Sequence, residues 1–533
     1  MSGTLNWSIL GLYVVASIAI GWRTSGQIET SENLFLGQKK TPWWAIGISI
    51  LATYVSALSF LGGPAWAYEE GLSALAVHIN YPIVIFIVIV VCLPFFYNAG
   101  VPSIYAYLER RFGVRSRVLM AGLFLITQGL SSATLLASTA WVLSFVTDLS
   151  VVNCILIVAA ISVAYTVFGG ITAVIWTDVL QALILLVGAV IVLVNLIPVL
   201  PNGLMAALSD LKAQGKTNAL ITDPDFTRAT TIWAGALAMT LYHSTVYGAN
   251  QMIIQRAIGA ASIGDAKKAF LLAGYIAVFI YALFMGIGLL LRVVYAGAEV
   301  ENGNTMILEF AQTLAIPGLM GLLASAVIAA SMSSLDSALN SMATVSVVDF
   351  AKRFSSTPLS ERQTLNLSRG LTVFWGLVLL GPAILIANET GSVLELVGKF
   401  GSYFIGAKLA LFGLGFFSKS VRETALLIGV AAGFAAVAYA ALQTDIAWPW
   451  YAVIGGVVNI AVAMLLSPLF GPAIVDWHPE TIRAQQIKMR EQPEPVGRWS
   501  AVPGVVDAPV WGLPVLFVAI LGSLFAFNFF IPN

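Results

Sequence analysis

Charged residues, cysteine and histidine are scarce in this sequence. Only 10% of the 533 residues are Asp, Glu, Lys or Arg, whereas a typical soluble protein has about 25%. The net charge is zero, so neither a nucleic acid nor an acidic partner is implied, and no obligate protein partner is evident. Cys92 and Cys154 lie in apolar runs and are interpreted as small buried hydrophobic residues, not as a disulfide or a metal pair.

Motifs of enzymes and of ATP-driven proteins are also missing. The three histidines are scattered and form no H-E-x-x-H pair, so a membrane-embedded metalloenzyme is not supported. The 47 glycines never fall in the phosphate-binding pattern G-x-x-x-x-G-K-[ST]. The longest loops, 200–230 and 471–507, are too short to fold alone, and residues 478–499 are interpreted as a solvated loop or an interfacial segment. We therefore predict that the protein is not an enzyme.

Hydrophobic residues are abundant instead. They make up 59% of the chain, and the mean hydropathy is +0.90. Apolar stretches of roughly 20 residues recur throughout, which predicts an all-α polytopic membrane protein. The first stretch lacks a basic segment before it and a cleavage site after it, so it is predicted to be a retained helix. About fourteen transmembrane helices are predicted, at 5–22, 43–66, 72–97, 115–146, 148–168, 173–199, 231–256, 269–295, 315–349, 366–388, 391–418, 421–442, 447–470 and 508–530.

The basic residues are distributed unevenly over the connecting loops. Most of the 26 Lys and Arg residues fall in alternate loops, one of which is predicted to hold Arg256, Lys267 and Lys268. The other loops hold only Lys212, Lys216 and Arg228. The positive-inside rule then predicts a multi-pass protein of the plasma or inner membrane, with both termini on the extracytoplasmic side and the basic loops in the cytoplasm.

Two of the predicted spans are interrupted near their centres. Span 43–66 contains "ATYVSALS" followed by Gly62, Gly63 and Pro64, and span 231–256 contains "YHSTVYGANQ" at a similar depth. The two spans are five helices apart, an offset that inverts topology, as an inverted five-helix repeat requires. Such breaks are typical of transporter binding sites, although ordinary packing faces rich in small residues remain the alternative.

The stretch "SMSSLDSALNS" (331–341) places serines and an aspartate inside an apolar span. On a helix, the polar positions around Ser333 and Asp336 fall within an arc of roughly 160°. The serines alone are compatible with bonds to the preceding turn and close helix packing. A carboxylate at membrane depth costs about 3 kcal/mol or more unless it is compensated. Sodium, a proton or Lys399 are the candidate partners of Asp336.

Further ionisable groups lie inside predicted spans and are candidate functional residues. Asp178 is one turn from the end of its span, so a water-exposed carboxylate is its alternative. Glu395 and Lys399 are spaced i, i+4 and are compatible with a self-neutralising pair. Lys408 lies in mid-span without an evident partner in the sequence.

Several stretches resemble the sodium/solute symporter family, whose members include sodium–glucose and sodium–sialic-acid symporters. They are "WWAIGISILATYVSALSFLGGPAWAY", "SIYAYLERRFGVRSR", "YTVFGGITAVIWTDVLQ", "YGANQMIIQR" and "AASMSSLDSALNSMATVSVVDF". The resemblance implies a single membrane transport domain (1–533) with a LeuT-like fold. It would consist of a leading helix at 5–22, a 5+5 inverted-repeat core at 43–418 and three trailing helices at 421–533, which include the cytoplasmic loop 471–507.

The resemblance also implies sodium as the coupling ion, and it assigns candidate sites. The main sodium site would use backbone oxygens of Ala52, Val55 and Ala330 and the hydroxyls of Ser333 and Ser334. A second cation site, known only in some members, would use Asp178, Ser333, Asp336 and Ser337. Members with that site usually have a hydroxyl where this chain has Asp336, which leaves the ion there open between sodium and a proton.

The solute-contacting positions of the family fall on polar residues of the two broken spans, on one histidine of the span 72–97 and on one lysine. They are Tyr54, Ser56, Ser59, His78, His243 and Lys399. Leu130 replaces the arginine that holds the carboxylate of sialic acid, which argues against that substrate.

The resemblance therefore predicts a sodium-coupled symporter that imports a small polar organic solute, a sugar, a polyol or a small carboxylate, by alternating access. The alternatives are a sodium-dependent channel-like protein or a sensor module, neither of which would concentrate a solute.

Overall fold

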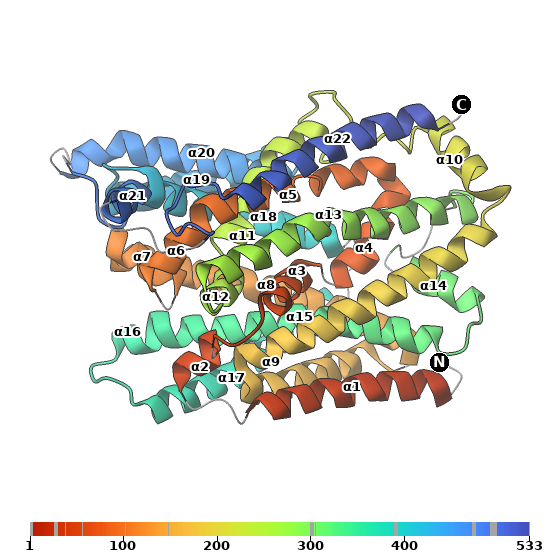
Figure 1. The fold of residues 1–533 in the computed structure, drawn as a ribbon, viewed down its shortest axis with the longest axis horizontal. Coiled ribbons are helices and arrows are strands. Elements are labelled where there is room, and N and C mark those ends of the chain that lie inside the picture. Colours follow the sequence, from red (N-terminus) through yellow and green to blue (C-terminus); the bar gives the residue numbers. More distant parts are fainter. Residues whose placement is uncertain are drawn as a thin grey trace.

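The computed structural model describes residues 4–25, 30–37, 39–55, 57–101, 103–147, 149–298, 303, 305–387, 393–471, 476–490 and 498–531. Over these residues the regular secondary structure is helical, and connecting loops contain a single β-bridge, between Ile221 and Thr231. The long helices run roughly along one common direction and stack in layers (Figure 1). This arrangement confirms the predicted all-α class, because a helix satisfies its own backbone hydrogen bonds where no water is available.

The helices in chain order are α1 (Thr4–Ser25), α2 (Ser31–Leu36), α3 (Trp43–Tyr54), α4 (Ala57–Glu70), η1 (Gly71–Val77), α5 (Tyr81–Ile87), η2 (Val88–Cys92), α6 (Leu93–Ala99), α7 (Ile104–Arg111), α8 (Val114–Thr147), α9 (Val151–Leu196), η3 (Ile197–Val199), α10 (Gly203–Ala213), η4 (Ala234–Ala238), α11 (Met239–Gly248), α12 (Gln251–Ile258), α13 (Ile263–Val294), α14 (Met306–Thr313), α15 (Leu319–Val345), η5 (Ser346–Ala351), α16 (Lys352–Phe354), α17 (Glu361–Ile386), α18 (Val393–Phe417), α19 (Glu423–Gln443), α20 (Pro449–Leu466), η6 (Ser467–Phe470), α21 (Ile482–Arg490), η7 (Ala508–Trp511) and α22 (Gly512–Phe530). Each predicted span overlaps at least one of these helices.

The predicted number of transmembrane helices is not confirmed by their length and hydropathy. Within the described residues, 11 helices are long and apolar enough to cross a membrane, so the count of fourteen is not confirmed. The predicted spans 148–168 and 173–199 are two helical segments of α9 that meet at a kink at Gly170. Gly170 has φ 55° and ψ −159°, a conformation that side chains with a Cβ rarely adopt. The kink separates two apolar segments, and in the sequence the boundary between them is marked only by the glycine pair 169–170.

The two ends of the described chain lie at the same end of the bundle. The start of α1 and the end of α22 are found there together with α10 and α14, whereas α2, α16 and α21 lie at the opposite end (Figure 1). This arrangement agrees with the prediction that successive loops alternate between the two sides of the membrane. Which end faces the cytoplasm stays a prediction from the distribution of Lys and Arg.

α15 is the most enclosed of the long helices. In its most apolar 18-residue window 89% of the residues are buried, compared with 11% for α22. It packs against α9, α8 and α1, and also against α3 and α4. The polar stretch 331–341 is therefore surrounded by protein, so its serines and its aspartate face other helices rather than lipid.

The chain between α20 and α22 packs on the core. Nζ of Lys267 on α13 lies 2.5 Å from Oδ2 of Asp507, and both side chains are buried. The backbone N–H of Gly504 donates to the carbonyl of Val90 at 2.7 Å. Asn98 donates to the carbonyl of Ala501 at 2.7 Å. The described part of this loop is therefore packed against the helices and is not merely solvated. Lys267, which was predicted to lie in a loop, is a buried residue of α13.

Candidate functional site

Both predicted helix breaks are present. α3 ends at Tyr54, Val55 leaves the helix with φ −81° and ψ 79°, and α4 begins at Ala57. In the other span, Ala249 and Asn250 are non-helical between α11 and α12, and the Asn250 side chain caps α12. The breaks leave backbone groups without helical partners at membrane depth, which is how transporters form ion and solute sites.

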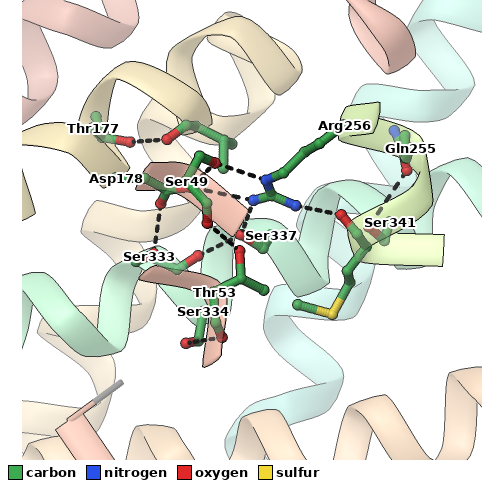
Figure 2. A network of polar contacts seen from close by, with 12 residues as sticks. Ser49, Thr53, Thr177, Asp178, Gln255, Arg256, Ser333, Ser334, Ser337 and Ser341 are labelled. Carbon is green, nitrogen blue, oxygen red and sulfur yellow. Dashed lines mark hydrogen bonds and ion pairs between the residues drawn. The ribbon is translucent and has the colours of Figure 1, made fainter. Parts of the chain in front are cut away.

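The predicted main sodium site lies where α3 ends against α15. Ser334 Oγ donates to the carbonyl of Thr53 at 3.0 Å, so the hydroxyl reaches the last turn of α3 (Figure 2). Ser333 Oγ donates to Asp178 Oδ1 at 2.6 Å. Ala52, Val55 and Ala330 are also buried. The arrangement brings carbonyl and hydroxyl oxygens together, and oxygen is the ligand that hard cations prefer.

We expect Ser334→Ala to raise the sodium concentration for half-maximal uptake about tenfold, because one oxygen ligand is lost at a buried site. Neither lithium nor potassium should restore uptake. The matched control is Ser325→Ala, since Ser325 is a buried serine of the same helix whose hydroxyl donates to the carbonyl of Gly321 at 2.8 Å, one turn earlier in α15. Sodium-dependent uptake into proteoliposomes measures both variants, and an unchanged sodium dependence in Ser334→Ala would exclude this site.

The residues predicted for a second cation site are partly brought together. Ser333, Ser337 and Asp178 belong to one buried network, but a residue that was not predicted lies among them: Arg256 (Figure 2). Its Nη2 is 3.3 Å from Asp178 Oδ2, and neither side chain is exposed. The assignment of Arg256 to a cytoplasmic loop was therefore wrong. The signal available in the sequence was its position only one and a half turns after the break at Asn250.

Asp336 occupies a different side of α15. Its carboxylate is fully buried and lies near Ser162 of α9. The hydrogen bonds described for Asp178 come from Ser49, Ser333 and Arg256. Lys399, a candidate partner of Asp336, has a side chain outside the described part of the structure, as do Glu395 and Tyr54, and Ser56 lies wholly outside it.

A cavity of about 220 Å³ lies beside the two breaks. Its walls come from α4, η1, α5, α8, α11, α13 and α18, and they include the predicted solute residues Ser59, His78 and His243. Thr53 and Ser334 also line it. The cavity therefore shares two residues with the predicted sodium site, which would allow an ion and a solute to influence each other's binding.

Four stacked rings form one wall of this cavity. The His78 ring is 3.8 Å from Tyr281 and 5.9 Å from His243, and Tyr81 is 4.8 Å from His243. In the described part of the structure, neither ring nitrogen of the buried His78 has a hydrogen-bond partner. Buried polar groups are normally paired, so a ligand in the cavity is a natural partner for His78.

The tautomer of His243 follows from its neighbour. Asn80 donates its amide to the carbonyl of Gly235 at 3.1 Å, so its oxygen faces His243 Nδ1 at 3.1 Å. Nδ1 must therefore carry a hydrogen and donate it to Asn80. In the neutral ring, Nε2 is left as an acceptor for a hydroxyl or amide of a ligand.

Lys408 is the charged residue of the cavity that the sequence did not explain. It is 5% exposed and lies on α18, and its Nζ is 5.6 Å from the centre of the Phe124 ring. The polar side chains of Gln128, Ser131 and Ser132 line the same cavity. None of the ion pairs found among the described residues involves Lys408. A buried ammonium group without a carboxylate is costly, and an anion in the cavity would compensate it.

Comparison with known proteins shows extensive similarity to transporters. Residues 34–433 match the sodium:solute symporter family. The chain is 30% identical to a sodium/sialic acid symporter of Aliivibrio fischeri, over 88% of this chain and 94% of that protein. It is 28% identical to the human sodium-coupled monocarboxylate transporter 1, over 80% of this chain and 70% of that protein.

A solved structure has the same fold. It is a substrate-bound, outward-open state of a Na⁺-coupled sialic acid symporter, and it is 27% identical to this chain with a TM-score of 0.82. The match covers 88% of this chain and 99% of the chain of the solved structure. The fold is therefore the LeuT-like fold that the sequence motifs implied.

Proposed function

Because the chain belongs to the sodium:solute symporter family, we propose that it uses a sodium gradient to import a small organic carboxylate by alternating access. The inverted-repeat core would extend over residues 43–418. The protein would lie in the plasma or inner membrane with both termini on the extracytoplasmic side, as the distribution of basic residues suggests. Sodium would bind where α3 ends against α15, and the solute would bind in the adjoining cavity.

Lys408 is the observation that carries the choice of solute. Its ammonium group is buried in a cavity, and the other polar side chains that line this cavity in the described part of the structure are hydroxyls, amides, imidazoles and indoles. A carboxylate would compensate this charge, whereas a sugar or a polyol would leave it unpaired. Relatives whose names specify sialic acid, a monocarboxylate or iodide all carry anions, which supports the choice. Leu130 argues for a carboxylate other than sialic acid.

Coupling would follow from the two residues that the ion site and the cavity share. Thr53 and Ser334 hold the end of α3 against α15 through one hydrogen bond, and both face the cavity. Sodium bound at this junction would hold both residues in place and so complete the wall that the solute contacts. Each ligand then favours the same arrangement, which is the condition for positive coupling between two sites.

A competition experiment tests the proposal. The uptake that is measured is the sodium-driven uptake of a radiolabelled small carboxylate into proteoliposomes. We expect unlabelled lactate, pyruvate or propionate to inhibit this uptake at least about 30-fold better than the matching amides, because only the acids pair with a buried cation. Replacement of the sodium gradient by potassium is the control, and it should abolish accumulation. Competition by glucose or polyols with no effect of the acids would favour a neutral solute. Equilibration without accumulation would identify a channel.

A further inference from the structure

The network around Asp178 contains a cation that belongs to the protein. Arg256 Nη2 contacts both Asp178 and Ser337, and Nε donates to Ser49 Oγ at 2.7 Å (Figure 2). Nη1 contacts the carbonyl of Met252. We infer that the guanidinium of Arg256 is the resident cation of the second site, so that this chain binds one sodium ion rather than two.

The hydrogen bonds of Asp178 leave little room for another cation. Oδ1 accepts from Ser333 at 2.6 Å, and Oδ2 accepts from Ser49 and from Arg256. All three nitrogens of the guanidinium have partners. A guanidinium group stays protonated in proteins, so the charge beside Asp178 does not depend on pH or on the sodium concentration.

Two of the residues assigned to a second sodium, Asp178 and Ser337, give their oxygens to Arg256. Ser337 Oγ is in contact with Nη2 of Arg256, and it donates its own hydrogen to the carbonyl of Ser333 at 2.6 Å. A sodium ion at these oxygens would lie against the guanidinium in a site without exposed surface. Like charges at this distance repel strongly where water is excluded. Sodium binding there would require Arg256 to leave.

The guanidinium of Arg256 connects several helices around Asp178, which is the structural role that a bound sodium ion would otherwise have. Arg256 lies on α12, directly after one helix break, and Ser49 lies on α3, before the other break. Asp178 on α9 and Ser337 on α15 complete the network. The guanidinium therefore joins both broken spans to α9 and α15 without an ion from solution.

The number of sodium ions bound to the purified full-length protein tests the inference. We expect saturation binding of ²²Na⁺ to give one ion per chain. Arg256→Gln should raise the number to two, because Asp178 is left without its cation. Arg256→Lys keeps the charge and should stay at one. The double variant Asp178→Asn/Arg256→Gln removes both charges and should also stay at one.

Two results would overturn the inference. One is a wild-type protein that binds two ions and loses one in the double variant, because Asp178 would then be a sodium ligand beside Arg256. The other is a folded Arg256→Gln protein, as judged by its melting temperature, that still binds one ion. If Arg256→Gln does not fold, the wild-type count and the charge-balanced double variant decide the question. None of these measurements involves the solute, so they do not depend on the proposed carboxylate.

Discussion

Replacement of Lys408 by Met is expected to weaken carboxylate binding by at least about 30-fold, because removal of one partner of a buried charge pair costs about 2 to 5 kcal/mol. Met has a similar length and fills the space of the lysine stem. The ligand-free protein should not lose thermal stability, since the substitution removes a buried ammonium group that has no carboxylate partner among the described residues. Concentration-dependent uptake in proteoliposomes and ligand-induced thermal shifts measure the two effects separately.

Two controls separate charge from shape in this experiment. Lys352→Met removes a lysine from an exposed position of α16 and should leave the affinity unchanged. The preference for the acid over its amide should disappear in Lys408→Met, because the amide never paired with the ammonium group. A Lys408→Met protein that retains both the affinity and the acid preference would show that the carboxylate binds elsewhere or that the solute is neutral.

Replacement of Lys267 by Ala is expected to destabilise the protein by about 3 to 5 kcal/mol, because it leaves Asp507 as an unpaired buried charge. Asp507 Oδ1 also accepts from the backbone of Ser500 at 2.8 Å, so the loss should loosen the docked chain before α22. The melting temperature in detergent and the rate of proteolysis near Trp499 measure this effect.

The neighbouring lysine provides a matched control. Lys268 is one residue away and pairs with Asp265 at 3.2 Å, but its side chain is 40% exposed. Lys268→Ala should therefore cost at most about 1 kcal/mol, as is usual for exposed pairs. The double variant Lys267→Met/Asp507→Leu should recover most of the stability, because it removes both charges together. Equal melting temperatures for Lys267→Ala and Lys268→Ala would contradict a buried pair.

Features encoded by neighbouring residues could be predicted from the sequence. The helical class follows from long apolar runs, and the breaks at Val55 and Asn250 follow from polar and small residues at mid-span. The predicted solute residues Ser59, His78 and His243 do line one cavity; Ser59 and His243 belong to the two interrupted spans, and His78 lies on the span between them in sequence. Local composition determines where a helix loses its hydrogen bonds, so these positions are visible without the fold.

The partners of the buried charges were decided only by the tertiary structure. Arg256 appeared to be a loop cation by its distance from the apolar run, yet it pairs with Asp178, 78 residues away in sequence. Lys267 appeared to belong to the same loop, yet it pairs with Asp507. Lys408 had no evident role until α18 placed it in the cavity with His78 and His243. A charge at membrane depth is visible in a sequence because its burial is costly, but the group that compensates it is set by the packing of helices distant along the chain.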